Sequence, residues 1–263
     1  MILISGLSSQ IGIQIFKNIN KSKIINLGRN RFKNTQYIFM DIDNCKFNKK
    51  KLIKFSNQIK IFINIGYSRN AKNKKFNYKI IKKILPILNK KTVMINISTL
   101  SALTSSLYGI EKLKIEKEFE KYDGINIRCG LIYNKILDGF FKKIIDIGEI
   151  FRILLLPNFF KKEIFYLTKL DNLIKTILRI IRKKKYKKNY IILNKKKYNF
   201  PNLINKFSTK KIYYIFIANF LFEFILKIFS NLKVLDIDED SFVSIKQINS
   251  DKIISPNFKL ILD

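Results

Sequence analysis

The chain has 263 residues, and its 52 lysines and arginines against 19 aspartates and glutamates give a formal net charge of +33. It contains no histidine and two cysteines, Cys45 and Cys129, which argues against a metal centre and against a disulfide framework. The charge indicates either a polyanionic partner or the composition of an AT-biased coding sequence. Because the basic residues are spread along the chain, we favour coding bias and expect no nucleic-acid partner.

The N-terminus has none of the features of a signal peptide. Met1 leads directly into a short apolar run, without a basic segment or a long hydrophobic stretch. We therefore expect a cytoplasmic protein.

Short β-branched runs alternate with segments of helical periodicity through the first half of the chain. Continuous apolar strands separated by helices are typical of a parallel sheet that is covered on both faces. The sequence therefore predicts an α/β fold, a Rossmann-like doubly wound parallel sheet. The predicted strands are 2–5, 23–27, 37–40, 60–65, 93–98 and 125–129.

The first predicted strand is followed by the stretch SGLSSQIG. Gly6 can form a tight turn and Gly12 lets a helix pack closely on the strand, as in turns that hold a dinucleotide pyrophosphate at a helix N-terminus. Ser9 stands where the usual fingerprint has its middle glycine. The alternative is an ordinary glycine and serine turn. The predicted cofactor-binding residues of this turn are Gly6, Ser8, Ser9, Gln10, Ile11 and Gly12.

Residues at later strand ends extend this predicted cofactor site. Arg29 follows the second strand, where a basic residue favours a 2′-phosphate, and hence NADP over NAD. In so basic a chain, a chance arginine is the alternative explanation. Asp41 and Ile42 follow the third strand, and Gly66 follows the fourth.

The stretch from 95 to 119 carries the candidate catalytic residues. Thr99 ends a predicted strand, and Tyr108 and Lys112 lie four residues apart, on one face of a predicted helix. A neighbouring ammonium group stabilises a phenolate, so the pair can act as acid or base near neutral pH. The alternative is a surface tyrosine and lysine on an amphipathic helix.

Taken in order, these motifs resemble the short-chain dehydrogenase/reductase superfamily, and within it the extended NAD-dependent epimerase/dehydratase branch that acts on nucleotide sugars. The resemblance covers residues 1–180. Departures from the family pattern are Ser9, Cys129, Asn134 and Asn172, and the short connection between Thr99 and the tyrosine motif. The stretches that carry the resemblance are SGLSSQIG, LGRN, DID, INIG, IST, YGIEK, INIRCGLIYN and YLTKLDNLIKTIL.

The resemblance implies a role for each predicted site residue. Tyr108 would be the acid/base, Lys112 would support it and bind the nicotinamide ribose, and Thr99 would orient the substrate oxygen. The glycine-rich turn would hold the pyrophosphate, and the remaining residues the adenosine and the middle of the cofactor: Arg29, Asp41, Ile42 and Gly66.

The implied activity is hydride transfer at a sugar carbon by an NAD(P)-dependent nucleotide-sugar epimerase or reductase, serving surface polysaccharide synthesis. No acidic residue accompanies Thr99, which makes dehydration less favoured. The resemblance also implies a homodimer through the helices expected at 75–88 and 108–122. The alternative is a non-catalytic cofactor-binding or RNA-associated protein that kept the fold.

The pattern loosens after about residue 130. We expect residues 1–195 to form the dinucleotide-binding domain, with 131–163 partly facing the substrate, and 196–263 to form a small, mainly helical substrate-binding subdomain. Within it, 213–229 is strongly apolar, but it contains two charges and is shorter than the roughly 20 residues of a spanning helix. We expect a helix there, either buried or in peripheral contact with a membrane.

Overall fold

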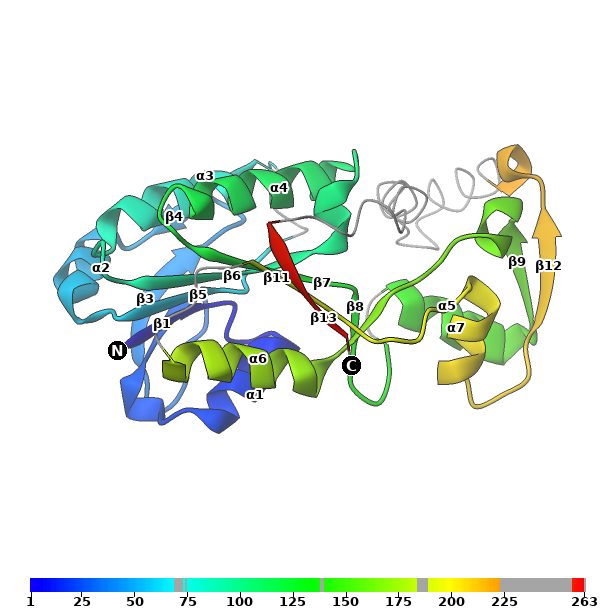
Figure 1. Ribbon diagram of the computed structural model, residues 1–263, viewed down its shortest axis with the longest axis horizontal. Coiled ribbons are helices and arrows are strands. Elements are labelled where there is room, and N and C mark those ends of the chain that lie inside the picture. Colours follow the sequence, from blue (N-terminus) through cyan, green and yellow to red (C-terminus); the bar gives the residue numbers. More distant parts are fainter. Residues whose placement is uncertain (69–72, 74, 138–139, 184–188, 223–256, 263) are drawn as a thin grey trace.

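A nine-stranded sheet forms the larger part of the molecule (Figure 1). The computed structural model describes residues 1–263 except 69–72, 74, 138–139, 184–188, 223–256 and 263. The order of the sheet is β13-β11-β7-β6-β5-β1-β2-β3-β4, and its neighbouring strands are parallel except for β3 and β4. The strands are β1 (Ile2–Ser5), β2 (Ile24–Gly28), β3 (Gln36–Asp41), β4 (Lys46–Phe47), β5 (Ile61–Asn64), β6 (Val93–Thr99), β7 (Ile125–Cys129), β11 (Asn189–Leu193) and β13 (Phe258–Leu262).

The predicted doubly wound sheet is confirmed. All six predicted strands are present, as β1, β2, β3, β5, β6 and β7, with ends that agree to within one residue. The strand order reverses between β1 and β5, because the chain proceeds from β1 to β3 on one side and from β5 to β11 on the other. In open α/β sheets, ligands bind outside the carboxyl ends of the strands at such a reversal.

Helices cover both faces of the sheet. On one face, α1 and α6 bury Ile15 and Ile177 against the strands, and on the other α2, α3 and α4 bury Leu52, Ile80 and Ile115 (Figure 1). This two-sided burial explains why the strands are almost continuously apolar. The helices are α1 (Gln10–Asn18), α2 (Lys49–Phe55), α3 (Phe76–Ile84), α4 (Leu107–Glu120), α5 (Phe140–Phe151), α6 (Leu170–Lys183) and α7 (Phe200–Phe207).

A second hydrophobic core lies at the end of the molecule where α5 and α7 pack (Figure 1). Its centre is a group of aromatic rings, in which Phe160 stacks on Phe200 with 4.2 Å between the ring centroids. Two small parallel sheets accompany it. One pairs β8 (Leu131–Tyr133) with β10 (Leu167–Lys169), and the other pairs β9 (Ile153–Pro157) with β12 (Tyr213–Ile217).

The second core takes residues from both sides of the predicted domain boundary at residue 195. Its buried members come from 137–167 and from 198–212, whereas β13, near the end of the chain, belongs to the large sheet. The division into 1–195 and 196–263 stays a prediction.

The predicted helix over 213–229 is wrong at its start. Tyr213–Ile217 is the strand β12, which pairs with β9 along its whole length. The stretch YYIFI is aromatic and β-branched, and its partner lies about sixty residues earlier, so a local pattern could not reveal the pairing. Residues 223–229 lie outside the described part of the chain. In the part that is described, we find no helix with both the length and the hydrophobicity needed to span a membrane.

Buried polar side chains connect four central strands, from the carboxyl ends of β1 and β5 to the middle of β6 and the start of β7. Ser5 Oγ donates to Asn64 Oδ1 over 2.7 Å, Asn64 Nδ2 donates to Asn96 Oδ1 over 2.9 Å, and Asn96 Nδ2 donates to Asn126 Oδ1 over 2.9 Å. Each pair occupies directly opposite positions on β1, β5, β6 and β7. We call these four residues the polar ladder. Because they are buried, a slip in the register of any strand would leave amide groups without partners.

Asn96→Ala tests the polar ladder. The substitution removes the partner of both Asn64 and Asn126, and we expect it to lower the free energy of unfolding by about 3 kcal/mol, since each unsatisfied buried group costs about 1–3 kcal/mol. Urea unfolding measures this change. Asn18→Ala, which removes an exposed amide on α1, is the control and should change the value by less than about 0.5 kcal/mol. Equal, small effects of both substitutions would contradict the account.

Candidate functional site

The turns after β1 and β5 lie against each other at the strand-order reversal. Gly6 has a φ of 77°, and a Cβ atom there would lie 2.6 Å from the backbone nitrogen of Gly66. Both the left-handed backbone and the close approach therefore require glycine at position 6. The ladder fixes this contact, because Ser5 Oγ accepts a hydrogen bond from the Gly66 N–H over 3.3 Å.

Ser9 completes the turn before α1 and caps that helix. Its Oγ accepts from the Gly12 N–H over 3.1 Å and donates to the Gly6 carbonyl over 2.7 Å. A Cβ atom on Gly12 would lie 2.5 Å from the same carbonyl, so the helix starts in direct contact with the turn. Of the other predicted residues here, Ser8 and Gln10 are exposed and Ile11 is buried.

The N-terminus of α1 fits an anion such as a pyrophosphate. Its first turn contains no acidic residue, so neither a carboxylate nor its charge opposes the helix dipole. The tight approach of Gly6 and Gly66 leaves backbone, and no side chain, at the centre of the strand ends. These observations fit the cradle that a dinucleotide cofactor requires.

Arg29 lies beyond β2, where the sequence predicted it, but its charge is paired. Its Nη1 lies 2.8 Å from Asp43 Oδ2, and the Ser68 hydroxyl donates to the other oxygen of the same carboxylate. Because the Arg29 side chain is largely exposed, this pair contributes about 0–1 kcal/mol, and an anion can replace Asp43 at little cost.

Asp41 ends β3, and Ile42 follows it at the same edge of the sheet. Asp41 accepts hydrogen bonds from Asn44 Nδ2 over 2.7 Å and from the Asp43 N–H over 3.0 Å. These donors, that of Asn44 first, lower the pKa of Asp41 below its usual value. Asp41 is therefore an ionised turn residue, and Ile42 is half-buried beside it.

Tyr108 and Lys112 lie together at the start of α4, as their spacing predicted. The Lys112 side chain is buried, with Nζ donating to the Ile97 carbonyl on β6 over 3.2 Å. The same Nζ lies 5.9 Å from the centroid of the Tyr108 ring. A buried ammonium group beside a tyrosine favours the phenolate form of that tyrosine.

Tyr67 belongs to this group, and the sequence analysis missed it. Its ring meets the Tyr108 ring edge to face, with 4.8 Å between centroids, and Lys112 Nζ lies 5.0 Å from the Tyr67 centroid. The Tyr67 hydroxyl donates to Glu111 Oε2 over 3.4 Å. The sequence could have indicated Tyr67 by its position, because Tyr67 directly follows Gly66 beyond the end of the central strand β5.

The electrostatics of α4 are governed by burial. Desolvation is the largest cause that raises the pKa of Glu111 above its usual value. Farther along the helix, Glu116 forms a buried ion pair with Arg128 on β7, with 2.6 Å between Oε2 and Nη2. This pair and Lys112 fix one face of α4 against the sheet, so Tyr108 projects from a rigid element.

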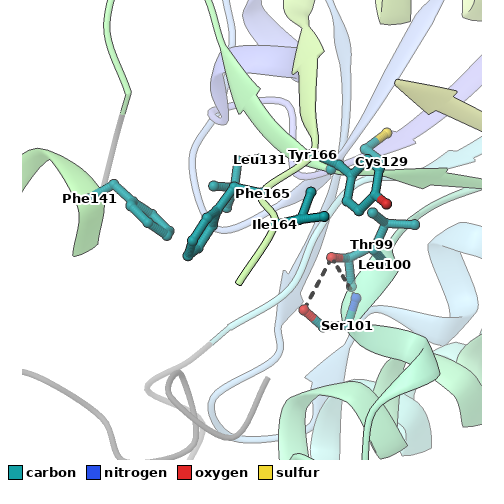
Figure 2. A pocket seen from close by; sticks show the side chains of 10 residues that line it. Thr99, Leu100, Ser101, Cys129, Leu131, Phe141, Ile164, Phe165 and Tyr166 are labelled. Carbon is teal, nitrogen blue, oxygen red and sulfur yellow. Dashed lines mark hydrogen bonds between the residues drawn. The ribbon is translucent and has the colours of Figure 1, made fainter. Parts of the chain in front are cut away.

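Thr99 ends β6 and lines a cavity of about 80 Å³ (Figure 2). Its Oγ1 accepts a hydrogen bond from the Ser101 N–H over 3.3 Å, at the start of the short 3-10 helix Leu100–Leu103. Tyr108 and Lys112 are not among the residues that line this cavity. The lining residues are Thr99, Leu100, Ser101, Cys129, Gly130, Leu131, Phe141, Ile164, Phe165 and Tyr166.

The short connection between Thr99 and Tyr108 is tightly folded. Eight residues separate the two, and they form the 3-10 helix and the N-cap Ser106 of α4. Gly109 packs directly on the Ser101 carbonyl, where a side chain would not fit. The first turn of α4 is thereby held against the segment that follows Thr99.

Cys129 contributes a thiol to the cavity wall, but burial keeps that thiol from reacting as a nucleophile. Desolvation raises the pKa of its thiol to about 12, so the thiol stays protonated at neutral pH. At the end away from Thr99, Figure 2 shows Phe141 beside Phe165, and their rings meet edge to face with 5.7 Å between the centroids. The cavity is therefore polar at Thr99 and Ser101 and aromatic at its far end.

No protein-family model matches the sequence, and no curated protein matches it either. Solved structures, however, share its fold. UDP-glucuronic acid 4-epimerase from Bacillus cereus, in complex with UDP-glucuronic acid and NAD, superposes with a TM-score of 0.64 at 16% identity, over 96% of this chain and 98% of its own. UDP-N-acetylglucosamine 4-epimerase from the same organism superposes with a TM-score of 0.62 at 14% identity, over 83% of this chain and 86% of its own.

A dTDP-4-dehydrorhamnose reductase from Bacillus anthracis str. Ames, in complex with NADP, gives a TM-score of 0.60 at 14% identity, over 84% of this chain and 85% of its own. The fold is that of NAD-dependent epimerases and reductases. At these identities the likeness concerns the fold, and at that level it supports the family resemblance that the motifs indicated.

Gly6→Ala tests the turn at the strand-order reversal. The new Cβ would meet the backbone of Gly66 in a left-handed conformation, and we expect a loss of about 2 kcal/mol in the free energy of unfolding. Gly28→Ala is the matched control, because its Cβ would lie 3.6 Å from Asn26 Oδ1, an ordinary contact. Urea unfolding of both variants measures the difference. Equal stabilities would show that the two turns do not constrain each other.

Proposed function

We propose that the protein is an NAD(P)-dependent nucleotide-sugar epimerase or reductase. The observation that carries the proposal is the buried ammonium group of Lys112 beside Tyr108, at the carboxyl edge of a doubly wound sheet. An acid/base tyrosine requires a neighbouring cation that stabilises its phenolate, and Lys112 is placed to provide it.

The proposed cofactor site runs along the carboxyl ends of the central strands. The turn from Gly6 to Gly12 would hold the pyrophosphate at the N-terminus of α1, and Gly66 would face the middle of the cofactor. Arg29, released from Asp43, would accept a 2′-phosphate, which favours NADP over NAD. A bound nicotinamide supplies a hydride donor or acceptor.

The proposed chemistry of the protein itself is proton transfer at a substrate oxygen. Tyr108 gives a proton to that oxygen or takes one from it, and Lys112 stabilises the phenolate that forms. Thr99, at the polar end of the cavity, would bind the same oxygen and orient it. Tyr67 would hold the Tyr108 ring in place through the edge-to-face contact.

A nucleotide sugar suits the charge of the protein, because its diphosphate would enter a strongly positive field. We further propose that the protein works in the cytoplasm in surface polysaccharide synthesis. The exposed side chains of Leu107 and Ile110 on α4 support the proposal of a homodimer through α3 and α4.

Tyr108→Phe tests the catalytic proposal. The variant keeps the ring contacts but lacks the phenolic hydroxyl whose proton would be transferred. We expect turnover to fall by about two to four orders of magnitude, while NADPH binding stays unchanged. The assays are conversion of UDP-glucuronic acid or UDP-N-acetylglucosamine in the presence of NAD, analysed by NMR, and oxidation of NADPH with dTDP-4-dehydrorhamnose.

Tyr122→Phe is the control for this experiment, because it removes a hydroxyl just beyond the far end of α4. It should retain full activity. If wild type and Tyr108→Phe both bind NADPH and convert none of these compounds, the protein is a cofactor-binding protein without this activity. If Tyr108→Phe keeps wild-type turnover, the acid/base role of Tyr108 is refuted.

A further inference from the structure

The small sheet of β9 and β12 is apolar on both of its faces. Its inner side chains, among them Leu154 and Leu156, belong to the second core. Its outer side chains form two directly opposite pairs, Tyr213 with Ile153 and Ile215 with Leu155. These four outer side chains, which we call the β9–β12 face, are each between 46% and 56% exposed.

This exposure is unusual for a two-stranded sheet. A sheet with one face in water normally alternates polar outside with apolar inside. The apolar character also continues beyond both ends of the strands. Phe151, the last residue of α5, lies two residues before the start of β9 with 70% of its surface exposed, and Phe220 lies three residues after β12 with the same exposed fraction. Large exposed apolar patches of this kind mark interaction surfaces.

Cations border the face. Arg152 directly precedes β9 and Lys211 lies two residues before the start of β12, with its Nζ 5.1 Å from the centroid of the Tyr213 ring. Lys210 is exposed next to them. An apolar centre with a basic border matches the layered chemistry of an anionic lipid surface, which is acyl chains beneath negative headgroups.

The acidic residue near this border does not cancel its charge. Glu149, near the end of α5, accepts hydrogen bonds from the Thr209 N–H and from the Ser208 hydroxyl, and its negative charge interacts with Lys210. Against this single negative charge stand the three positive charges of Arg152, Lys210 and Lys211, so the border keeps a positive balance.

We propose that the β9–β12 face docks the protein on an anionic lipid surface. Tyr213, Ile153, Leu155 and Ile215 enter the boundary between headgroups and acyl chains, and the bordering lysines and arginine bind lipid phosphates. Each basic residue near such a surface contributes about 1 kcal/mol.

The charge distribution favours lipid over a second copy of the chain. Two copies that met through this face with their strands parallel would bring Arg152, Lys210 and Lys211 of one against the same residues of the other, and like charges in contact oppose association. An anionic bilayer presents the opposite sign. The face lies at the end of the molecule away from α2 and β3, so docking leaves the large sheet accessible (Figure 1).

Vesicle flotation of the full chain tests this proposal. We expect binding to vesicles of phosphatidylcholine mixed with phosphatidylglycerol, and much weaker binding to phosphatidylcholine alone. Leu155→Gln combined with Ile215→Gln, which leaves the net charge unchanged, should lower the partition coefficient about tenfold or more. Lys210→Gln combined with Lys211→Gln should lower it to a similar extent.

The matched controls lie on α2, at the other end of the molecule. Ile53→Gln removes an equally exposed apolar side chain, and Lys50→Gln combined with Lys51→Gln removes the same number of exposed charges. Both controls should bind like wild type. Unfolding of each variant in urea confirms that it folds.

Three outcomes would overturn the proposal. If the face variants and the α2 control variants lose vesicle binding equally, the total charge of the protein attracts it to the lipid without a defined docking face. If wild type does not bind the vesicles and the variant with both Leu155→Gln and Ile215→Gln is much less stable, the face makes contacts within the chain and not with lipid. A wild-type dimer that this variant dissociates would assign it to a second copy. None of these measurements requires the proposed enzymatic activity, so the two proposals fail independently.

Discussion

The polar ladder from Ser5 to Asn126 is the constraint on which the candidate site depends. It fixes the relative register of β1, β5, β6 and β7, and the carboxyl ends of the first three of these strands lead to Gly6, Gly66 and Thr99. An apolar sheet would pack equally well in several registers, but buried amides bond in one. The ladder therefore determines where the turns meet, and with them where a cofactor and a substrate oxygen can lie.

The sequence predicted those features that depend on local order along the chain. Strand runs, the glycine-rich turn and the four-residue spacing of Tyr108 and Lys112 are patterns within a few residues, and the structure contains all of them. Contacts between distant segments were not predicted. Tyr67 meets Tyr108 across forty-one positions, and β12 pairs with β9 across about sixty. The prediction of a helix at YYIFI was wrong because its aromatic and β-branched residues favour a strand, and the partner strand lies too far along the chain for a local pattern to reveal it.

The large positive charge acts differently at the two ends of the molecule. Near β2 and β3, Arg29 is paired with Asp43, so a bound phosphate would replace one anion by another. Around the β9–β12 face, Arg152, Lys210 and Lys211 border an apolar surface, and the single carboxylate of Glu149 beside Lys210 leaves their summed charge positive. The first arrangement fits selection of a small anionic ligand, and the second fits attraction to an extended anionic surface.

The central claim is that the turn from Gly6 to Gly12 binds a nicotinamide cofactor although Ser9 replaces a glycine. Ser9 supports the turn through its bonds to Gly6 and Gly12, which explains how the site tolerates it. The most direct test is fluorescence titration of the protein with NADPH and with NADH at low and at high salt. The account predicts a dissociation constant on the order of micromolar that persists at high salt, with NADPH bound more tightly. Binding that disappears at high salt, or is absent throughout, would contradict it.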